Sequence, residues 1–198
     1  GAAHRRSRCV RLFARRYTST AGDVVSSPIM GNAGPVAGRR TERVWTGLDV
    51  LVEKRFAPLR GCAVGLICNP TSVDRRLRHA ADLLHEARGV RLAALFGPEH
   101  GVRGDIQYMA AARGGRDRKI GVPVHSLYGN SAGSLRPAGR ALRGLDALVF
   151  DIQDVGARYY TYQATMLFCM EAAAHAKLDF FVLDRPNPIG GRPVEGPA

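Results

Sequence analysis

Short apolar segments that each end in a polar motif constrain this 198-residue chain more than any other feature. The clearest is residues 147–150, which is followed at once by Asp151, Gln153, Asp154 and Arg158. A wholly apolar run of this length is typical of a strand that is buried on both faces, as in a parallel sheet. Packing such a strand does not require acidic and basic side chains at its end, so they indicate a ligand site.

The same pattern recurs along the chain and alternates with helical periodicity. Because strands that alternate with helices favour a parallel arrangement with right-handed crossovers, we predict an α/β fold with a mostly parallel open sheet flanked by helices. The polar motifs would then share the carboxyl edge of the sheet, where such folds bind ligands. The predicted strands are 63–67, 90–96, 122–128, 147–150 and 179–183, and the predicted helices are 46–55, 74–88, 136–143 and 159–177.

Residues 1–43 are predicted to be a leader or a disordered segment, and residues 44–198 to be the folded domain. The N-terminal segment is rich in Arg, Ser, Gly and Pro and lacks the apolar stretch that a secretory signal needs. Its composition fits a transit peptide, and a mis-assigned start is an alternative. The compartment therefore stays open.

Composition and motifs disfavour several classes of protein. The net charge is +12, but the basic residues are not interleaved with the aromatic residues on which nucleic acids stack. No apolar run approaches the roughly 20 residues of a membrane span. The four cysteines lack metal-ligand spacing and no phosphate-binding glycine loop follows a strand, so we predict no metal, no cofactor and no nucleotide.

Glu99 is the leading candidate for proton transfer, because it lies in a turn whose neighbours Pro98 and Gly101 limit backbone freedom. A rigid turn can hold a general acid or base in place. His100 could orient Glu99 or be structural, and a surface carboxylate is the alternative for Glu99 itself. Several carboxylates, arginines and tyrosines around one crevice favour acid/base chemistry on a polar, anionic small substrate, with two-carboxylate glycoside hydrolysis as one example.

Arg158 and Arg185 could each bind a carboxylate through two hydrogen bonds, or could instead pair with Asp154 or Asp184. Likewise, Arg103 could pair with Asp105, which follows it in a long loop. The tyrosines at 159, 160 and 162 straddle a helix start, where one face packs in the core and a ring on the other could stack on a sugar.

From residue 47 onward the chain resembles the N-terminal half of the NamZ-type exo-β-N-acetylmuramidases. Two of the most distinctive matching motifs are Gly-Pro-Glu-His-Gly around Glu99 and Asp-Ile-Gln-Asp from Asp151 to Asp154. All the matching motifs occur in the same order, which makes the match more specific than any single motif. They span residues 47–51, 69–74, 95–101, 126–129, 149–162, 183–191 and 194–197.

The resemblance implies a Rossmann-like N-terminal subdomain and a hydrolase that removes N-acetylmuramic acid from the non-reducing end of peptidoglycan fragments, of the MurNAc-GlcNAc type. It implies a secreted or periplasmic enzyme whose active site lies in a cleft against a C-terminal subdomain, and this subdomain is missing because the sequence ends at Ala198. The loop after Gly104 also lacks an acidic residue of the family pattern. A sugar-binding module without activity is therefore the alternative.

The predicted site residues come from both lines of reasoning. Those predicted to be catalytic are Glu99, His100 and Asp151, and those predicted to bind substrate are Asn69, Arg103, Tyr128, Asp154, Arg158, Tyr160, Asp184, Arg185, Asn187 and Glu195.

Overall fold

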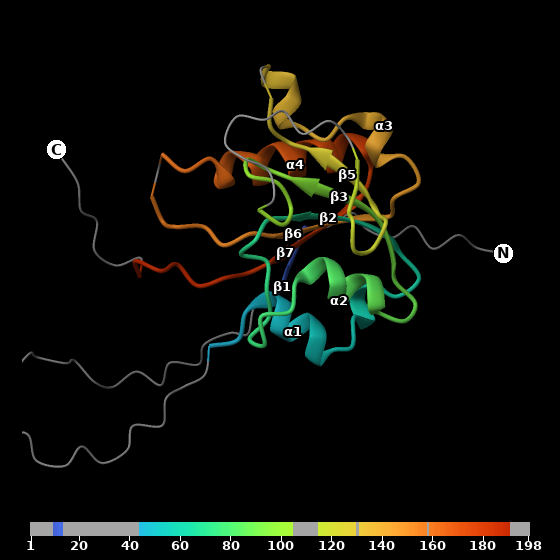
Figure 1. Ribbon diagram of the computed structural model, residues 1–198, viewed down its shortest axis with the longest axis vertical. Helices are drawn as coiled ribbons and strands as arrows, with labels where there is room; N and C mark the ends of the chain where they lie inside the picture. Colours follow the sequence, from blue (N-terminus) through green and yellow to red (C-terminus); the bar gives the residue numbers. More distant parts are fainter. Residues whose placement is uncertain (1–9, 14–43, 105–114, 130, 158, 191–198) are drawn as a thin grey trace, which may run out of the picture.

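The computed structural model describes residues 10–13, 44–104, 115–129, 131–157 and 159–190, which form a sheet with helices on both faces (Figure 1). The described part contains a seven-stranded sheet in the order β1-β7-β6-β2-β3-β5-β4, in which only the β4–β5 pair is antiparallel. The strands are β1 (Val10–Phe13), β2 (Ala63–Cys68), β3 (Arg91–Gly97), β4 (Gly115–Arg116), β5 (Pro123–Ser126), β6 (Ala147–Asp151) and β7 (Asp179–Leu183).

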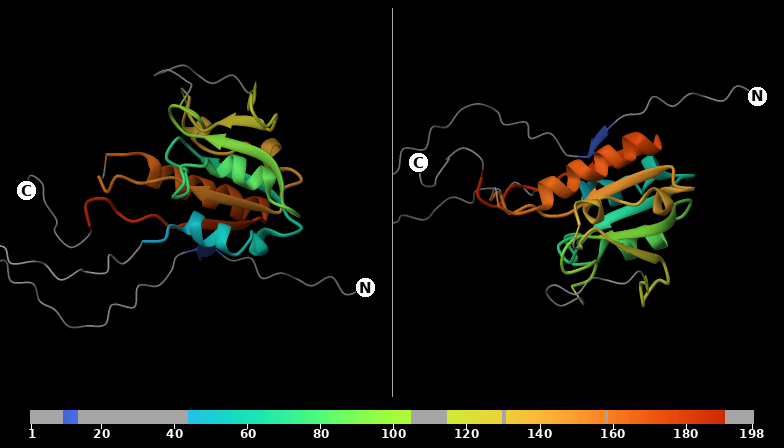
Figure 2. Two further views of the ribbon diagram at one scale, coloured as in Figure 1. Left: turned by 60° about the horizontal axis from the view of Figure 1, so that its bottom comes forward. Right: turned by 90° about the horizontal axis from the view of Figure 1, so that it is seen from above.

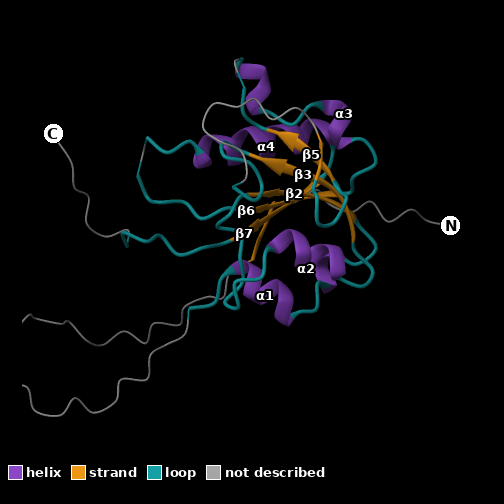
Figure 3. Ribbon diagram, in the orientation of Figure 1, coloured by secondary structure: helices purple, strands orange, loops and turns teal. Residues whose placement is uncertain are grey.

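Two hydrophobic cores lie on opposite faces of the sheet. Helices α1 (Gly47–Glu53) and α2 (Ala80–Glu86) cover one face, and α3 (Gly139–Leu142) and α4 (Tyr162–Ala176) cover the other (Figures 2 and 3). Along β6, Ala147 and Val149 pack in the first core, whereas Leu148 and Phe150 pack in the second. Both faces of the strand are buried, which explains why its sequence is apolar without alternation.

The strand order places a topological switch point between β2 and β6. From β2 the chain runs through α2 to β3 on one side, and from β6 it runs through α4 to β7 on the other side. Loops that leave adjacent strands in opposite directions open a crevice at their carboxyl ends, which is where doubly wound folds bind ligands. The predicted mostly parallel α/β sheet with flanking helices is confirmed.

The predicted helix over residues 74–88 is wrong at its start, because α2 begins only at Ala80. Asp74 Oδ1 accepts hydrogen bonds from the backbone N–H groups of Arg76 and Arg78, which holds residues 74–78 in a turn. The Nδ1 atom of His79 then accepts from the N–H of Ala81 and caps the helix. Local side-chain hydrogen bonds of this kind compete with the helical pattern.

Strand β1 lies inside residues 1–43, a segment for which no element of the fold was predicted. Val10–Phe13 pairs in parallel with Phe180–Leu183, so these four residues form the edge strand beside β7. This strand was not predicted, and the leader or disorder prediction stays untested for the rest of that segment, which lies outside the described residues. The two-residue strand β4, within the predicted long loop, was also missed, because so short a segment has no periodicity.

Within the described ranges, no helix is both long enough and apolar enough to cross a membrane.

Candidate functional site

The loops after β2 and β6 are joined by hydrogen bonds at the switch point. The Ser72 hydroxyl donates to the carbonyl oxygen of Asp151 and accepts from the N–H of Asn69 at 3.0 Å. The N–H of Gln153 donates to the hydroxyl of Thr71, also at 3.0 Å. These contacts fix the Asn-Pro-Thr-Ser motif against the Asp-Ile-Gln-Asp motif, so the two polar motifs form one wall of the crevice.

The loop after β7 joins the same wall. The side-chain amide of Gln153 donates to the carbonyl oxygens of Pro186 and Asp154, both at 2.8 Å. Gly156 has a positive φ of 77°, and a Cβ at this position would collide with the side-chain oxygen of Asn187. Glycine is therefore required here both by the backbone conformation and by the close approach of the two loops.

Glu99, Asn69, Tyr160 and Tyr162 gather where the loops after β2 and β3 meet the start of α4. The side chain of Asn69 hydrogen-bonds the hydroxyl of Tyr162. Burial raises the pKa of the Tyr162 hydroxyl, electrostatic interaction with Tyr160 and Glu99 raises it further, and the hydrogen bond with Asn69 opposes them. The Tyr160 and Tyr162 ring centroids lie 5.7 Å apart. Tyr162 was one of three tyrosines predicted to straddle the helix start, for core packing or for stacking on a sugar, but it was not among the predicted site residues.

The turn that carries Glu99 is tight. Pro98 is buried, Glu99 is half-buried, and the N–H of Gly101 donates to the carbonyl oxygen of Pro98 at 3.0 Å. His100 is exposed and adopts a positive φ of 70°, a conformation that is uncommon for a residue with a Cβ. The turn thus holds Glu99 half-buried at the carboxyl edge of the sheet, while His100 lies at the solvent side.

Asp151 is fully buried and forms a bidentate ion pair with Arg185. The Nε and Nη2 atoms of Arg185 donate to its two carboxylate oxygens at 2.7 and 3.0 Å, and Nη2 also donates to the carbonyl oxygen of Val73. Burial raises the pKa of Asp151, and the charge and hydrogen bonds of Arg185 oppose that rise. Arg185 was expected to pair, if at all, with Asp154 or Asp184, and this expectation is wrong. The geometry ties Asp151 to Arg185 beneath the crevice and leaves its carboxylate without access to solvent.

Arg103 is likewise occupied by carboxylates. It donates to Asp82 at 2.7 Å and to Asp117 at 2.5 Å, and Lys119 donates to Asp82 at 2.7 Å. Burial alone would lower the pKa of Arg103, but its bonds to Asp117 and Asp82 outweigh burial and raise it. The other candidate partner, Asp105, lies outside the described residues.

Asp154 has one satisfied and one unsatisfied carboxylate oxygen. Its Oδ2 atom accepts from the side-chain amide of Gln163 at 3.0 Å, whereas Oδ1 is buried without a hydrogen-bond partner among the described residues. Arg158 and Glu195, two further predicted site residues, lie outside those residues. A buried polar atom without a partner is uncommon in native proteins and is a feature of sites that receive a ligand.

The remaining predicted residues lie around this group. Asp184 and Asn187 are exposed on the loop after β7, where the Asp184 carbonyl accepts from the N–H of Gly47 at 2.6 Å and Asn187 Oδ1 accepts from the N–H of Ile189. Tyr128 is half-buried after β5. In the described part of the chain, no three His, Cys, Asp or Glu side chains cluster in a way that could hold a metal ion.

The fold and this edge define a Rossmann-like α/β domain with polar loops at its switch point, where such folds bind ligands. The family described as "Exo-beta-N-acetylmuramidase NamZ, N-terminal" matches residues 64–198, and the chain belongs to this family. It is 48% identical over 155 residues to the peptidoglycan β-N-acetylmuramidase NamZ of Bacillus subtilis, a match that covers 78% of this chain and 37% of that protein.

Two crystal structures of DUF1343 family proteins from Bacteroides fragilis are similar in fold. One is 51% identical, with a TM-score of 0.69, and the match covers 77% of this chain and 37% of that one. The other is 33% identical, with a TM-score of 0.60, and the match covers 74% and 36%. The chain thus spans little more than a third of the length of these relatives.

Proposed function

We propose that this domain takes part in removing N-acetylmuramic acid from the non-reducing end of peptidoglycan fragments, with Glu99 as the general acid or base. Family membership supports a cell-wall muramidase role, since the similar Bacillus protein is described as a peptidoglycan β-N-acetylmuramidase. Glycoside hydrolysis needs a carboxyl group that can give a proton to the leaving oxygen or take one from water.

The observation that carries the proposal is the state of Glu99 among the acidic side chains. Asp151 and Asp117 are held by arginines, and both are buried. Glu99 forms no ion pair within the described ranges, is half-buried, and follows β3 at the carboxyl edge of the sheet. A carboxylate that is not neutralised by a fixed cation can exchange a proton with a substrate, whereas one locked in an ion pair cannot do so readily.

Asp154 and Arg158 are proposed to hold the substrate. Asp154 Oδ1 can accept a hydrogen bond from a sugar hydroxyl or amide N–H, because it lacks another partner in the described part. Arg185 and Arg103 are already bound to carboxylates, so Arg158, which follows Asp154 by four positions in the sequence, is the better candidate to bind the lactyl carboxylate of N-acetylmuramic acid.

Replacing Glu99 tests the proposal. In the intact gene product that contains these residues, Glu99→Gln should lower the rate of N-acetylmuramic acid release from a chromogenic β-N-acetylmuramide by roughly a hundredfold to ten-thousandfold, because a general acid or base contributes that much. Glu86→Gln, at an exposed glutamate at the end of α2, is the matched control and should retain full activity. Full activity of Glu99→Gln would remove Glu99 from the chemistry.

A sugar-binding role without catalysis is the second candidate, favoured by the share of the relatives' length that this chain spans. Calorimetry of the 198-residue chain with N-acetylmuramic acid separates the two candidates. Saturable binding without turnover in the intact gene product supports the binding role, and turnover that depends on Glu99 supports the hydrolase.

A further inference from the structure

On the α4 face of the sheet, β3 and β5 are covered by much less structure than β6 and β7. The connection from β5 to β6 contains α3, a single turn of four residues, whereas α4 has fifteen (Figure 1). A cavity of about 470 Å³ opens beside α3. Ala93, Ala94 and Pro123 from the two strands and Ala141 and Leu145 from the α3 region form its apolar lining.

The polar lining of this cavity is entirely basic. Arg91, Arg140, Arg143 and His125 line it, and no carboxylate does. In the described part of the chain none of the three arginines forms an ion pair with an acidic side chain. The Nη2 atom of Arg91 donates to the carbonyl oxygen of Gly144 at 3.2 Å, which fixes this guanidinium at the rim of the cavity. Asp146 lines a neighbouring pocket together with Arg91, and its Oδ2 atom accepts from the N–H of Ala63 at 2.7 Å.

His125 places a ring inside this basic group. Its ring stacks on Phe96 with centroids 5.3 Å apart, which fixes its orientation on the sheet. Both His125 and Arg140 line the cavity, and the pKa of His125 is lowered by burial and further by the positive charge of Arg140. An anion bound between them would offset this positive charge and accept their hydrogen bonds.

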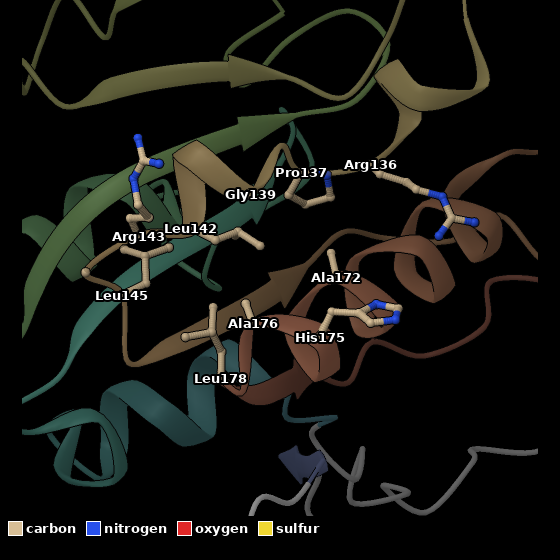
Figure 4. Close-up of a pocket in the computed structure, with 11 residues that line it drawn as sticks. Arg136, Pro137, Gly139, Leu142, Arg143, Leu145, Ala172, His175, Ala176 and Leu178 are labelled. Carbon is tan, nitrogen blue, oxygen red and sulfur yellow. The ribbon is translucent and has the colours of Figure 1, made fainter.

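Arg143 also borders a second cavity of about 600 Å³, between α3 and the end of α4 (Figure 4). In this view its guanidinium points away from α4, and His175 and Arg136 lie at the far side. Arg136 is paired with Glu171 and packs over the Phe168 ring, so it is less able to bind a ligand. The unpaired arginines therefore concentrate on the side of α3 that faces β3.

We propose that the cavity lined by Arg91, His125, Arg140 and Arg143 binds a small organic anion that carries a phosphate or carboxylate group. Guanidinium groups bind both through paired hydrogen bonds, and the volume lies within the range of small-molecule sites. The site is separate from the crevice at the carboxyl ends of the strands, because Arg91 begins β3 and Leu145 precedes β6. It therefore does not depend on the proposed muramidase function.

Calorimetry of the 198-residue chain with pyrophosphate and, separately, with citrate tests the site and distinguishes phosphate from carboxylate. The double variant Arg140→Gln/Arg143→Gln should bind the preferred anion at least about tenfold more weakly, since it loses two charge-assisted contacts. Arg76→Gln is the matched control, because Arg76 is an exposed arginine beside α2 on the other face of the sheet, and its affinity should stay within about twofold of the parent.

Nuclear magnetic resonance gives a second readout, in which the ring signals of His125 should shift on titration with the same anion. The proposal is overturned if neither pyrophosphate nor citrate binds saturably with a dissociation constant below about 10 mM, which corresponds to a binding free energy of only some 3 kcal/mol. An equal loss of affinity in Arg76→Gln, or His125 signals that stay unchanged at saturation, would likewise reject it in favour of unspecific attraction to a basic protein.

Discussion

Acidic residues at the carboxyl edge differ in their partners, and the partner decides what each carboxylate can do. Asp151 is enclosed with Arg185, whose side chain is only 7% exposed, while Glu99 is half-buried and forms no ion pair in the described part of the chain. The two aspartates of the Asp-Ile-Gln-Asp motif also differ. Both carboxylate oxygens of Asp151 accept from Arg185, whereas Oδ1 of Asp154 has no hydrogen-bond partner among the described residues. The same functional group is therefore a structural anchor at one position and a candidate for chemistry at another.

The buried pair allows a stability prediction at residue scale. Arg185→Met should destabilise the domain by roughly 3–5 kcal/mol, because it leaves the carboxylate of Asp151 buried without a counter-charge. Glu171→Gln is the control, since the Arg136–Glu171 pair is about 40% exposed on both sides and its loss should cost no more than about 1 kcal/mol. Urea unfolding measures both variants, and equal losses would contradict a structural role for the buried pair.

The cluster of Arg103 with Asp82 and Asp117 predicts loss of stability in acid. Burial would raise the pKa values of Asp82 and Asp117, but hydrogen bonds, chiefly from Arg103, outweigh it and hold both pKa values below normal. Since the unfolded chain then binds protons more readily, their contribution is present above the unfolded pKa of about 4 and is lost as pH falls below it. Asp151, whose pKa is raised, acts in the opposite direction.

Urea unfolding from pH 7 to about pH 2.5 tests this dependence. The free energy of unfolding should fall below about pH 4, and Asp117→Asn should be less stable at pH 7 and show a flatter decline, because one of the linked carboxylates is gone. An unchanged slope in Asp117→Asn would show that other carboxylates control the acid transition.

At the scale of elements, β2 depends on a glycine in its centre. A Cβ at Gly65 would lie 2.7 Å from Leu148, 2.8 Å from Phe96 and 2.9 Å from Leu145, three side chains of the core beneath α3 and α4. The sequence predicts the strand but not the requirement for glycine at position 65, because the side chains that approach it come from residues far along the chain. β2 lies at the switch point between β3 and β6, and this face of the strand is closely packed.

We therefore expect Gly65→Ala to destabilise the domain by roughly 1–3 kcal/mol, because overpacking forces neighbouring side chains out of their rotamers. Gly139→Ala, in α3, is the matched control, since a Cβ there meets nothing within 4 Å. Thermal or urea unfolding compares the two variants. A neutral Gly65→Ala would show that the core can shift to accept a methyl group.

At the scale of the whole molecule, the sheet continues beyond the part that motifs identify. Strand β1 pairs with β7 through four residues that lie at least thirty positions before the next described segment. A chain end that pairs with the edge of a sheet protects the backbone N–H groups of the neighbouring strand from hydrogen exchange. It also prevents that strand from pairing with other chains. The N-terminal strand is thus part of the folded unit, although its sequence resembles a leader.

A chain that starts at Val44 should keep the fold but expose the edge of β7. Backbone N–H groups of β7 that face β1 should exchange with deuterium faster in this shortened chain, while those in β2 should not change, because β2 is covered on both sides by β3 and β6. Mass spectrometry of exchanged peptides measures both. Unchanged exchange across residues 179–183 would mean that β1 does not protect the edge.

The sequence by itself determined where the central strands lie and which edge carries the polar motifs. Four of the predicted strands, at 63–67, 90–96, 147–150 and 179–183, agree with β2, β3, β6 and β7 to within one residue at each end. Apolar runs and turn residues are local features that hold in any surroundings, so they could be identified without coordinates. The start of α2 and the strands β1 and β4 could not be identified from the sequence, because a side-chain cap and pairing at the edges of the sheet override the weak local pattern.

Only the tertiary structure decided how the polar side chains divide their roles. From the sequence, Arg185 was expected to pair, if at all, with Asp154 or Asp184, but the structure pairs it with Asp151, which is 34 residues away in sequence. Tyr162 joins Asn69 and Glu99 for the same reason, since three segments converge at one edge. Ion pairs and hydrogen bonds in a crevice depend on distances of a few ångströms between remote residues, and these are set by the strand order and not by sequence spacing.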